Sequence, residues 1–190
     1  MIEPFPNGLR SSITAQTNLR SLMKRILAGC LLSLLTASIA SGQSDAPRRF
    51  DLSARASEID SRAKAHPEIG FTFNDDKGKP QDVEHAVVDT RQKSKGQLVI
   101  WLMGHNQALF ERIASYGLHG IQPHYANRWF GLIDAQHRDD GTSLGKIRLE
   151  AATGEDFSPL VVVPKPDGMQ ERSLQFVKWL AKENPAGDWP

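Results

Sequence analysis

The chain has 190 residues, of which 39% are hydrophobic and 24% are charged, a balance typical of a globular domain rather than of a disordered or fibrous protein. Residues 1–42 hold four of the basic residues and one of the acidic residues, which leaves 19 basic and 21 acidic residues, a formal charge of −2, for the rest. Because these charges are scattered and nearly balanced, we expect no nucleic-acid partner.

The N-terminal region has the order of a Sec-type signal peptide, which we place at residues 23–42. A basic pair at 24–25 precedes the uncharged apolar run 26–40, and small residues then lead to a cleavage site between Gly42 and Gln43. An apolar run of about 15 residues is shorter than the roughly 20 that span a bilayer. The sequence therefore predicts a secreted or periplasmic protein with no stable membrane anchor after cleavage.

Two further features of this region concern processing. Residues 1–22 are interpreted as an upstream extension, with translation starting at Met23. Residues 27–30 (LAGC) match the four-residue motif of a bacterial lipoprotein box. Cys30 lies inside the apolar run, however, whereas the cysteine of a lipoprotein box follows the end of that run. This position favours a small residue of the signal core over a lipidation site. Cys30 is the only cysteine, so the mature domain must be held together by its apolar core.

The mature chain begins with residues 43–68, which we interpret as a polar N-terminal arm because their apolar stripe is thin. Residues 69–190 are predicted to form the domain. Residues 69–73 and 83–90 alternate between apolar and polar side chains and are joined by the dense turn signal 74–80. This pattern predicts an antiparallel hairpin.

The central prediction concerns residues 95–106 (KGQLVIWLMGHN), where the five apolar residues 98–102 precede a polar loop. This run predicts a strand that is buried on both faces. Residues 108–116 carry a helical apolar stripe that Gly117 is placed to end. Residues 118–125 are then expected to form a strand that returns parallel to the first.

The last third of the chain contains a long surface excursion at residues 126–144 and the strongest helix pattern at residues 169–184. Both predicted helices are expected to pack on the sheet. The side chains expected to be buried are those of Leu98, Ile100, Ile113, Val177 and Leu180.

The candidate site lies at the end of the predicted central strand, at Gly104, His105 and Asn106. A glycine-containing turn from strand to helix directs free main-chain N–H groups at the helix N-terminus, where they can stabilise an oxyanion. Asn106 can also act simply as the helix cap. The two roles do not exclude each other.

Metal and cofactor chemistry have little support in the sequence. His105, His119 and His124 lie near strand ends, but the six histidines form no closely spaced ligand pair, so ordinary hydrogen bonding is favoured and no metal is predicted. No Walker A, Gly-x-Gly-x-x-Gly or Gly-x-Ser-x-Gly motif occurs, so we predict no cofactor and find no serine nucleophile elbow. The acids interpreted as turn formers are Asp89, Asp134, Asp139 and Asp140.

The order of these elements resembles the N-terminal half of secreted bacterial α/β-hydrolase-like proteins, over about residues 70–190. The resemblance implies an α/β fold with a partial hydrolase-like sheet, made of the N-terminal hairpin plus parallel strands with packed helices. It also implies an esterase-type hydrolase that acts on a small-molecule or glycan ester once completed. The catalytic Ser, Asp and His would follow Pro190, which makes the chain a fragment.

Only the oxyanion loop of that family can be carried over, onto Gly104, His105 and Asn106, where the usual His-Gly order is reversed to Gly-His. The alternative is a noncatalytic exported small α/β domain with a binding or structural role. A Gly-x-Ser-x-Gly motif encoded downstream would favour the hydrolase, and a stop codon after Pro190 would favour the alternative.

Overall fold

The structure is a computed structural model that describes residues 46–126, 128, 131 and 141–190. These described residues belong to one unit, Asp45–Pro190. The predictions that lie outside them are the extension at 1–22, the signal peptide at 23–42, most of the surface excursion at 126–144, and the acids Asp134, Asp139 and Asp140.

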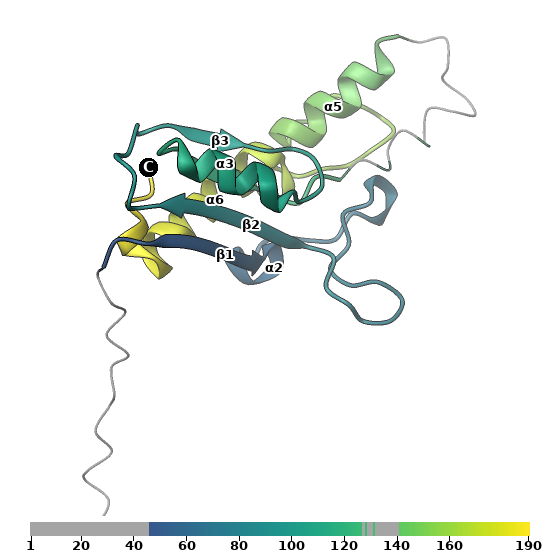
Figure 1. Cartoon of the computed structure of the whole chain (residues 1–190). Helices are drawn as coiled ribbons and strands as arrows, with labels where there is room; N and C mark the ends of the chain where they lie inside the picture. Colours follow the sequence, from purple (N-terminus) through teal and green to yellow (C-terminus); the bar gives the residue numbers. More distant parts are fainter. Residues whose placement is uncertain (1–45, 127, 129–130, 132–140) are drawn as a thin grey trace, which may run out of the picture. The chain divides into compact units, whose positions relative to one another are not determined.

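A four-stranded mixed sheet organises the domain (Figure 1). Its strands are β1 (Arg49–Arg55), β2 (Val83–Asp89), β3 (Leu98–Ile100) and β4 (His119–Gln122). Their spatial order is β1-β2-β4-β3, with β2 antiparallel to both of its neighbours and β3 parallel to β4. The α/β class is therefore confirmed, as is the parallel return strand after the first predicted helix.

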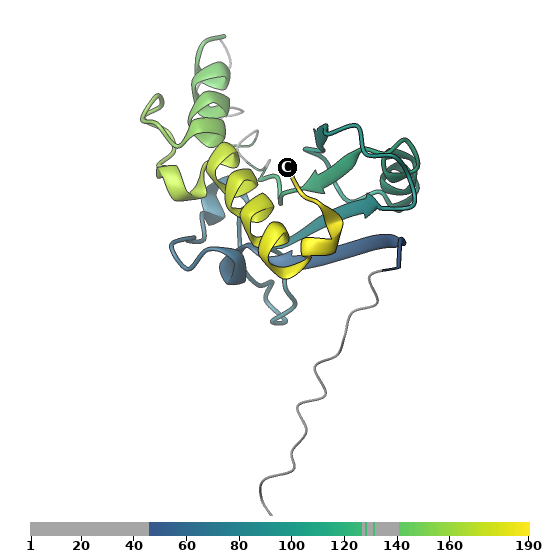
Figure 2. The same ribbon diagram turned by 90° about the vertical axis from the view of Figure 1, so that its left-hand side faces the viewer.

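Two helices cover opposite faces of this sheet (Figure 2). α3 (Gln107–Ser115) buries Ile113 against one face, and α6 (Met169–Glu183) buries Leu180 against the other. Both helices and both buried side chains confirm the sequence prediction, and Val177 is partly buried in the same core as Leu180. The sheet is thus the middle of three layers.

β2 pairs with a different strand from the one predicted, so the hairpin with residues 69–73 does not form. The segment 69–73 forms only an isolated bridge, between His66 and Phe71. β1, from the predicted arm 43–68, pairs along the whole of β2 instead. The physical reason is that Phe50 and Ala54 alternate with polar residues and are buried beneath α6, a short period-two pattern that the surrounding charges obscure in the sequence.

The predicted central strand is also wrong in its placement. Residues 98–102 contain only the three-residue strand β3, at the edge of the sheet, and 45% of Ile100 and 39% of Leu102 are exposed. Leu98 is partly buried. An apolar run cannot by itself distinguish a central strand from an edge strand, because both favour apolar, β-branched residues. β2 and β4 occupy the centre.

The remaining elements close the end of the domain around a second apolar core. α5 (Ser143–Thr153), which the sequence analysis did not predict, buries Ile147 beside Phe71 and Val163. Its apolar stripe is narrow, which explains the omission. No helix within the described ranges is long and apolar enough to cross a membrane. The short helices are α2 (Ala56–Ile59) and the 3-10 turns Pro67–Ile69, Lys165–Asp167 and Pro185–Gly187.

Candidate functional site

The loop of residues 101–106 leaves the carboxyl end of β3 and enters α3, and a hydrogen bond holds each end of it. The indole Nε1–H of Trp101 donates to the Gly104 carbonyl oxygen at 3.0 Å. The Asn106 side-chain oxygen accepts from the Leu109 main-chain N–H at 3.0 Å, which confirms the predicted helix cap. Gly104, His105 and Asn106 are exposed between these two anchors.

The imidazole of His105 is held against the sheet by ring contacts. It stacks on His85 of β2, with ring centroids 4.0 Å apart and planes 24° from parallel, and it meets the edge of Phe110 at 5.0 Å. Its Nε2 lies 3.2 Å from Oε1 of Gln107. His105 is therefore fixed by contacts with both the sheet and α3, although it lies in an exposed loop.

Burial sets the protonation state of His85, the ring on which His105 stacks. Burial lowers the pKa of His85 to about 4, and the nearby charge of His105 acts in the same direction. His85 is consequently neutral near pH 7. A neutral His85 can stack closely on His105 without repulsion between like charges.

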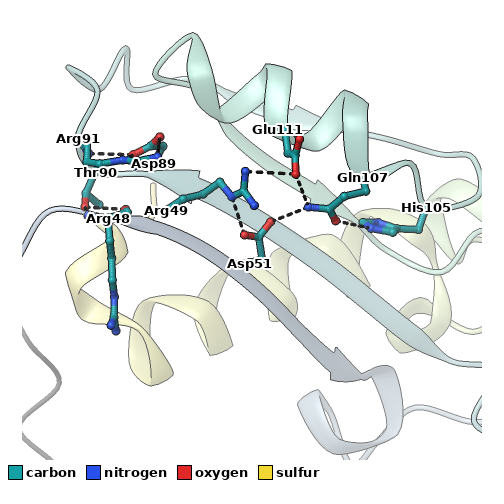
Figure 3. Close-up of polar contacts among 9 residues, drawn as sticks. All are labelled: Arg48, Arg49, Asp51, Asp89, Thr90, Arg91, His105, Gln107 and Glu111. Carbon is teal, nitrogen blue, oxygen red and sulfur yellow. Dashed lines mark hydrogen bonds and ion pairs between the residues drawn. The ribbon is translucent and has the colours of Figure 1, made fainter.

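A chain of polar contacts extends from His105 to the edge of the sheet (Figure 3). The side-chain amide of Gln107 donates to Asp51 at 3.3 Å and to Glu111 at 3.1 Å. Arg49 closes the chain, with Nε 2.7 Å from Asp51 and Nη1 3.3 Å from Glu111. These contacts connect β1 to the first turns of α3, directly beside the loop.

A cavity of about 130 Å³ lies beneath these contacts. The cavity is smaller than the roughly 300 Å³ at which small-molecule pockets begin, so it suits one small polar group rather than a whole substrate. The N-terminus of α3 opens beside it, and the first N–H groups of a helix have no partner within the helix and favour negative charge. The cavity is lined by Asp51, Leu52, Ser53, His85, Ala86, His105, Gln107 and Phe110.

The other histidines named from the sequence do not join this site. His119 is buried on the α6 face, where its Nε2 lies 2.9 Å from the Gly187 carbonyl oxygen, whereas His105 lies on the α3 face. His124 follows β4 and contacts the ring of Phe71. Within the part of the chain that the structure describes, no group of three or more His, Cys, Asp or Glu side chains could hold a metal ion.

Among the acids interpreted as turn formers, Asp89 can be assessed. It ends β2 and accepts from the Arg91 main-chain N–H at 3.1 Å and from the Arg91 guanidinium at 2.8 and 2.7 Å. The hydrogen bond from Arg91 holds the pKa of this carboxyl below its usual range. Asp89 therefore shapes the turn after β2, as predicted.

Sequence reasoning missed three residues that shape the loop: Asp51, His85 and Gln107. His85 could have been found, because it sits at an alternating position of a correctly predicted strand and so must face one side of the sheet. Asp51 could not, because its strand was interpreted as an arm. The role of Gln107 depends on Asp51 and was hidden for the same reason.

The comparisons with known proteins place no further restriction on the chain. No family model, no curated protein and no solved structure matches it. The loop after β3 is therefore the part of the molecule from which a function is inferred.

Proposed function

We propose that the chain carries the oxyanion-loop part of an exported, esterase-type α/β-hydrolase-like protein and lacks a catalytic triad of its own. In α/β-hydrolases one oxyanion-hole N–H comes from the loop between the third strand and the helix that follows it. Residues 101–106 connect β3 to α3, and this connection supports the proposal. Gly104, His105 and Asn106 are then the residues that supply main-chain N–H groups to a developing oxyanion.

The observation that carries this proposal is that the loop is both exposed and held in place. An oxyanion hole needs donors that are already positioned before charge develops on the substrate. The Trp101 hydrogen bond to Gly104, the Asn106 cap and the stacking of His105 on His85 supply that order. Catalysis would further need a nucleophile, which a downstream Gly-x-Ser-x-Gly motif would provide.

The test begins with the coding sequence that follows Pro190, and then measures the hydrolysis of p-nitrophenyl acetate by the longest in-frame product. Two variants form a matched pair at one position. His105→Pro removes the main-chain N–H as well as the imidazole, and His105→Ala removes only the imidazole. Loss of one oxyanion donor lowers kcat by about 100-fold or more, so we expect that loss in the proline variant and a much smaller change in the alanine variant.

Two results would contradict the proposal. A reading frame without a serine elbow, combined with no ester hydrolysis, would favour a noncatalytic exported binding domain. Equal activity of the two His105 variants would show that the main-chain N–H at this position does not contact the reacting oxygen.

Export is part of the same proposal and depends on residues 24–42. A basic pair, an uncharged apolar run and small residues occur there in the order that a signal peptidase requires. A fusion of residues 23–60 to a reporter should appear outside the cytoplasm with a new N-terminus at Gln43. Retention of the fusion in the cytoplasm would contradict export.

A further inference from the structure

A polar cavity of about 330 Å³ lies beyond the carboxyl end of β4. One wall is the turn segment 70–81, which in Figure 1 projects from the end of the sheet at the arrowhead of β1. The other wall is formed by His124, Tyr125 and Arg128, which follow β4. The volume is within the range of small-molecule pockets. Its polar side chains include Thr72, Asn74, Asp76, Gln81, Tyr125 and Arg128.

Hydrogen bonds hold the first wall in shape. The Asp75 carboxylate accepts from the main-chain N–H groups of Lys77 and Lys79, each at 2.9 Å. Arg55 of β1 donates to the Phe73 carbonyl oxygen at 2.9 Å. Because the turn is already fixed, a ligand would not have to offset the free energy of ordering it.

The second wall is attached to the first. The Arg128 main-chain N–H donates to the Ile69 carbonyl oxygen at 2.9 Å. Its side-chain stem packs on Gly70, where φ is +86° and an added Cβ would lie 2.7 Å from the Arg128 Cγ. The buried guanidinium of Arg172 donates to the His124 carbonyl oxygen, directly before Tyr125.

The groups that face this cavity are mixed in charge and rich in unused hydrogen-bonding capacity. Within the described residues, the side chains of Thr72, Asp76 and Arg128 make no hydrogen bond or ion pair with the protein. The carboxylates of Asp75 and Asp76 disfavour an anion, and Arg128 disfavours a cation. The lining therefore suits a neutral ligand that presents many donors and acceptors at once, which is the chemistry of a polyhydroxylated ring.

We propose that this cavity binds one pyranose unit of a carbohydrate. The inference rests on the proposed hydrolase function and deepens it, because it makes the substrate an ester on a sugar hydroxyl. The cavity follows β4 and the loop Gly104–Asn106 follows β3, so both lie at the carboxyl edge of the two parallel strands. Ligands of α/β sheets bind at that edge.

The test is an NMR titration of the full ¹⁵N-labelled chain with methyl glycosides of glucose, xylose and N-acetylglucosamine. We expect saturable shifts of the amides of residues 70–81 and of His124, Tyr125 and Arg128 by at least one glycoside, with Kd on the order of 1 mM for a ligand of this size. Asp76→Ala should weaken that binding about fivefold through loss of a charge-assisted hydrogen bond. Glu155→Ala, at another exposed acid, should leave it unchanged.

Three outcomes would overturn the proposal: no saturable shift with any glycoside, tighter binding of inorganic phosphate than of every glycoside, or unchanged glycoside binding by Asp76→Ala. Asp76 is exposed and has no partner among the described residues, so its substitution should not unfold the domain. The titration needs no catalysis. Failure of sugar binding is therefore distinguishable from failure of the hydrolase proposal, which the His105 variants and the downstream sequence decide.

Discussion

Two polar clusters lie on opposite faces of the sheet and differ in their exposure to solvent. On the α3 face, Asp51 and Gln107 are exposed and hydrogen-bonded. On the α6 face, Glu84 is 1% and Arg172 is 5% exposed, and neither carboxylate oxygen of Glu84 has a hydrogen-bond partner of ordinary geometry among the described residues. Exposure to solvent, rather than the number of contacts, therefore decides how much a polar cluster contributes to stability.

The strand geometry explains how a carboxylate reaches the buried side. Alternation along β2 directs Glu84 to the same face as Ala86 and Val88, beneath α6. Burial raises the pKa of Glu84 to about 7, although the charge of Arg172 opposes the rise. Burial likewise lowers the pKa of Arg172, opposed chiefly by Glu84. Each charge therefore offsets part of the desolvation of the other.

The largest expected effect follows from removing Arg172. Arg172→Met should lower the free energy of unfolding by about 3 kcal/mol at pH 8, because the buried Glu84 carboxylate then loses the positive charge that offsets part of its desolvation. The variant also loses the cation–π contact with Phe71, at 4.3 Å, and the donor to the His124 carbonyl. Urea unfolding followed by circular dichroism measures the change.

Two matched variants sharpen this test. Lys178→Met, at an exposed position of the same helix, should change the free energy by less than about 0.5 kcal/mol. The double variant Arg172→Met with Glu84→Gln should recover part of the loss, since no buried charge is then left unpaired. If Arg172→Met lowered the free energy of unfolding by less than about 1 kcal/mol, the buried cluster would contribute no more than the exposed one, which would contradict the difference between the two faces.

The second effect is a pH dependence of stability that belongs to Glu84. Its pKa in the folded chain, about 7, is raised above its ordinary value of 4.5, so the folded state holds the proton more tightly than the unfolded state. The stability that the neutral carboxyl contributes is full below pH 4.5 and is lost as the pH rises to about 7. Glu84→Gln should remove this loss, so the free energy of unfolding of the variant minus that of the wild type should increase from pH 4 to pH 8, by at most roughly 3 kcal/mol.

The measurement is the difference between the two unfolding free energies from pH 4 to pH 8. A difference is needed because burial lowers the pKa of His124 and of His85, and each of these contributes stability that falls as the pH decreases. Both histidines are present in the wild type and in Glu84→Gln, so their contributions to stability cancel in the difference. Glu58→Gln, at an exposed acid, is the matched control, and a flat difference profile for Glu84→Gln would contradict the raised pKa.

The same contrast explains what the sequence could and could not predict. The helices at 107–115 and 169–183 were predicted because their apolar stripes and their Gly117 and Asn106 boundaries are local signals. The position of β3 at the edge of the sheet was not predicted, because it depends on which strands pair across 20 or more intervening residues.

The candidate site divides in the same way. The loop after β3 and its cap follow from a short stretch of sequence, whereas the residues that hold it come from β1 and β2. Asp51 lies 56 positions from Gln107, the residue to which it accepts a hydrogen bond. Glu84 gave no signal either, since an acid in an alternating strand is ordinarily expected on the solvent side. Its burial follows only from the packing of α6.

The next effect concerns the helix cap that begins α3. Asn106→Ala removes the acceptor of the Leu109 N–H and should lower the free energy of unfolding by about 1 kcal/mol. Asn106→Asp keeps the acceptor and should retain most of that stability. Urea unfolding of the two variants in parallel measures the difference, and equal losses in both would show that the cap contributes nothing.

The smallest effect is expected in the exposed cluster. Asp51→Asn removes the charge that Arg49 contacts at 2.7 Å and weakens the contact with Gln107 at 3.3 Å, yet exposed pairs contribute only about 0.2 to 1 kcal/mol. We expect a loss below about 0.5 kcal/mol that shrinks further in high salt, because ions screen exposed charges. Asp156→Asn, at an exposed acid elsewhere, is the control. A salt-insensitive loss above about 1 kcal/mol would show that the series of polar contacts from Arg49 to His105 acts as one coupled network.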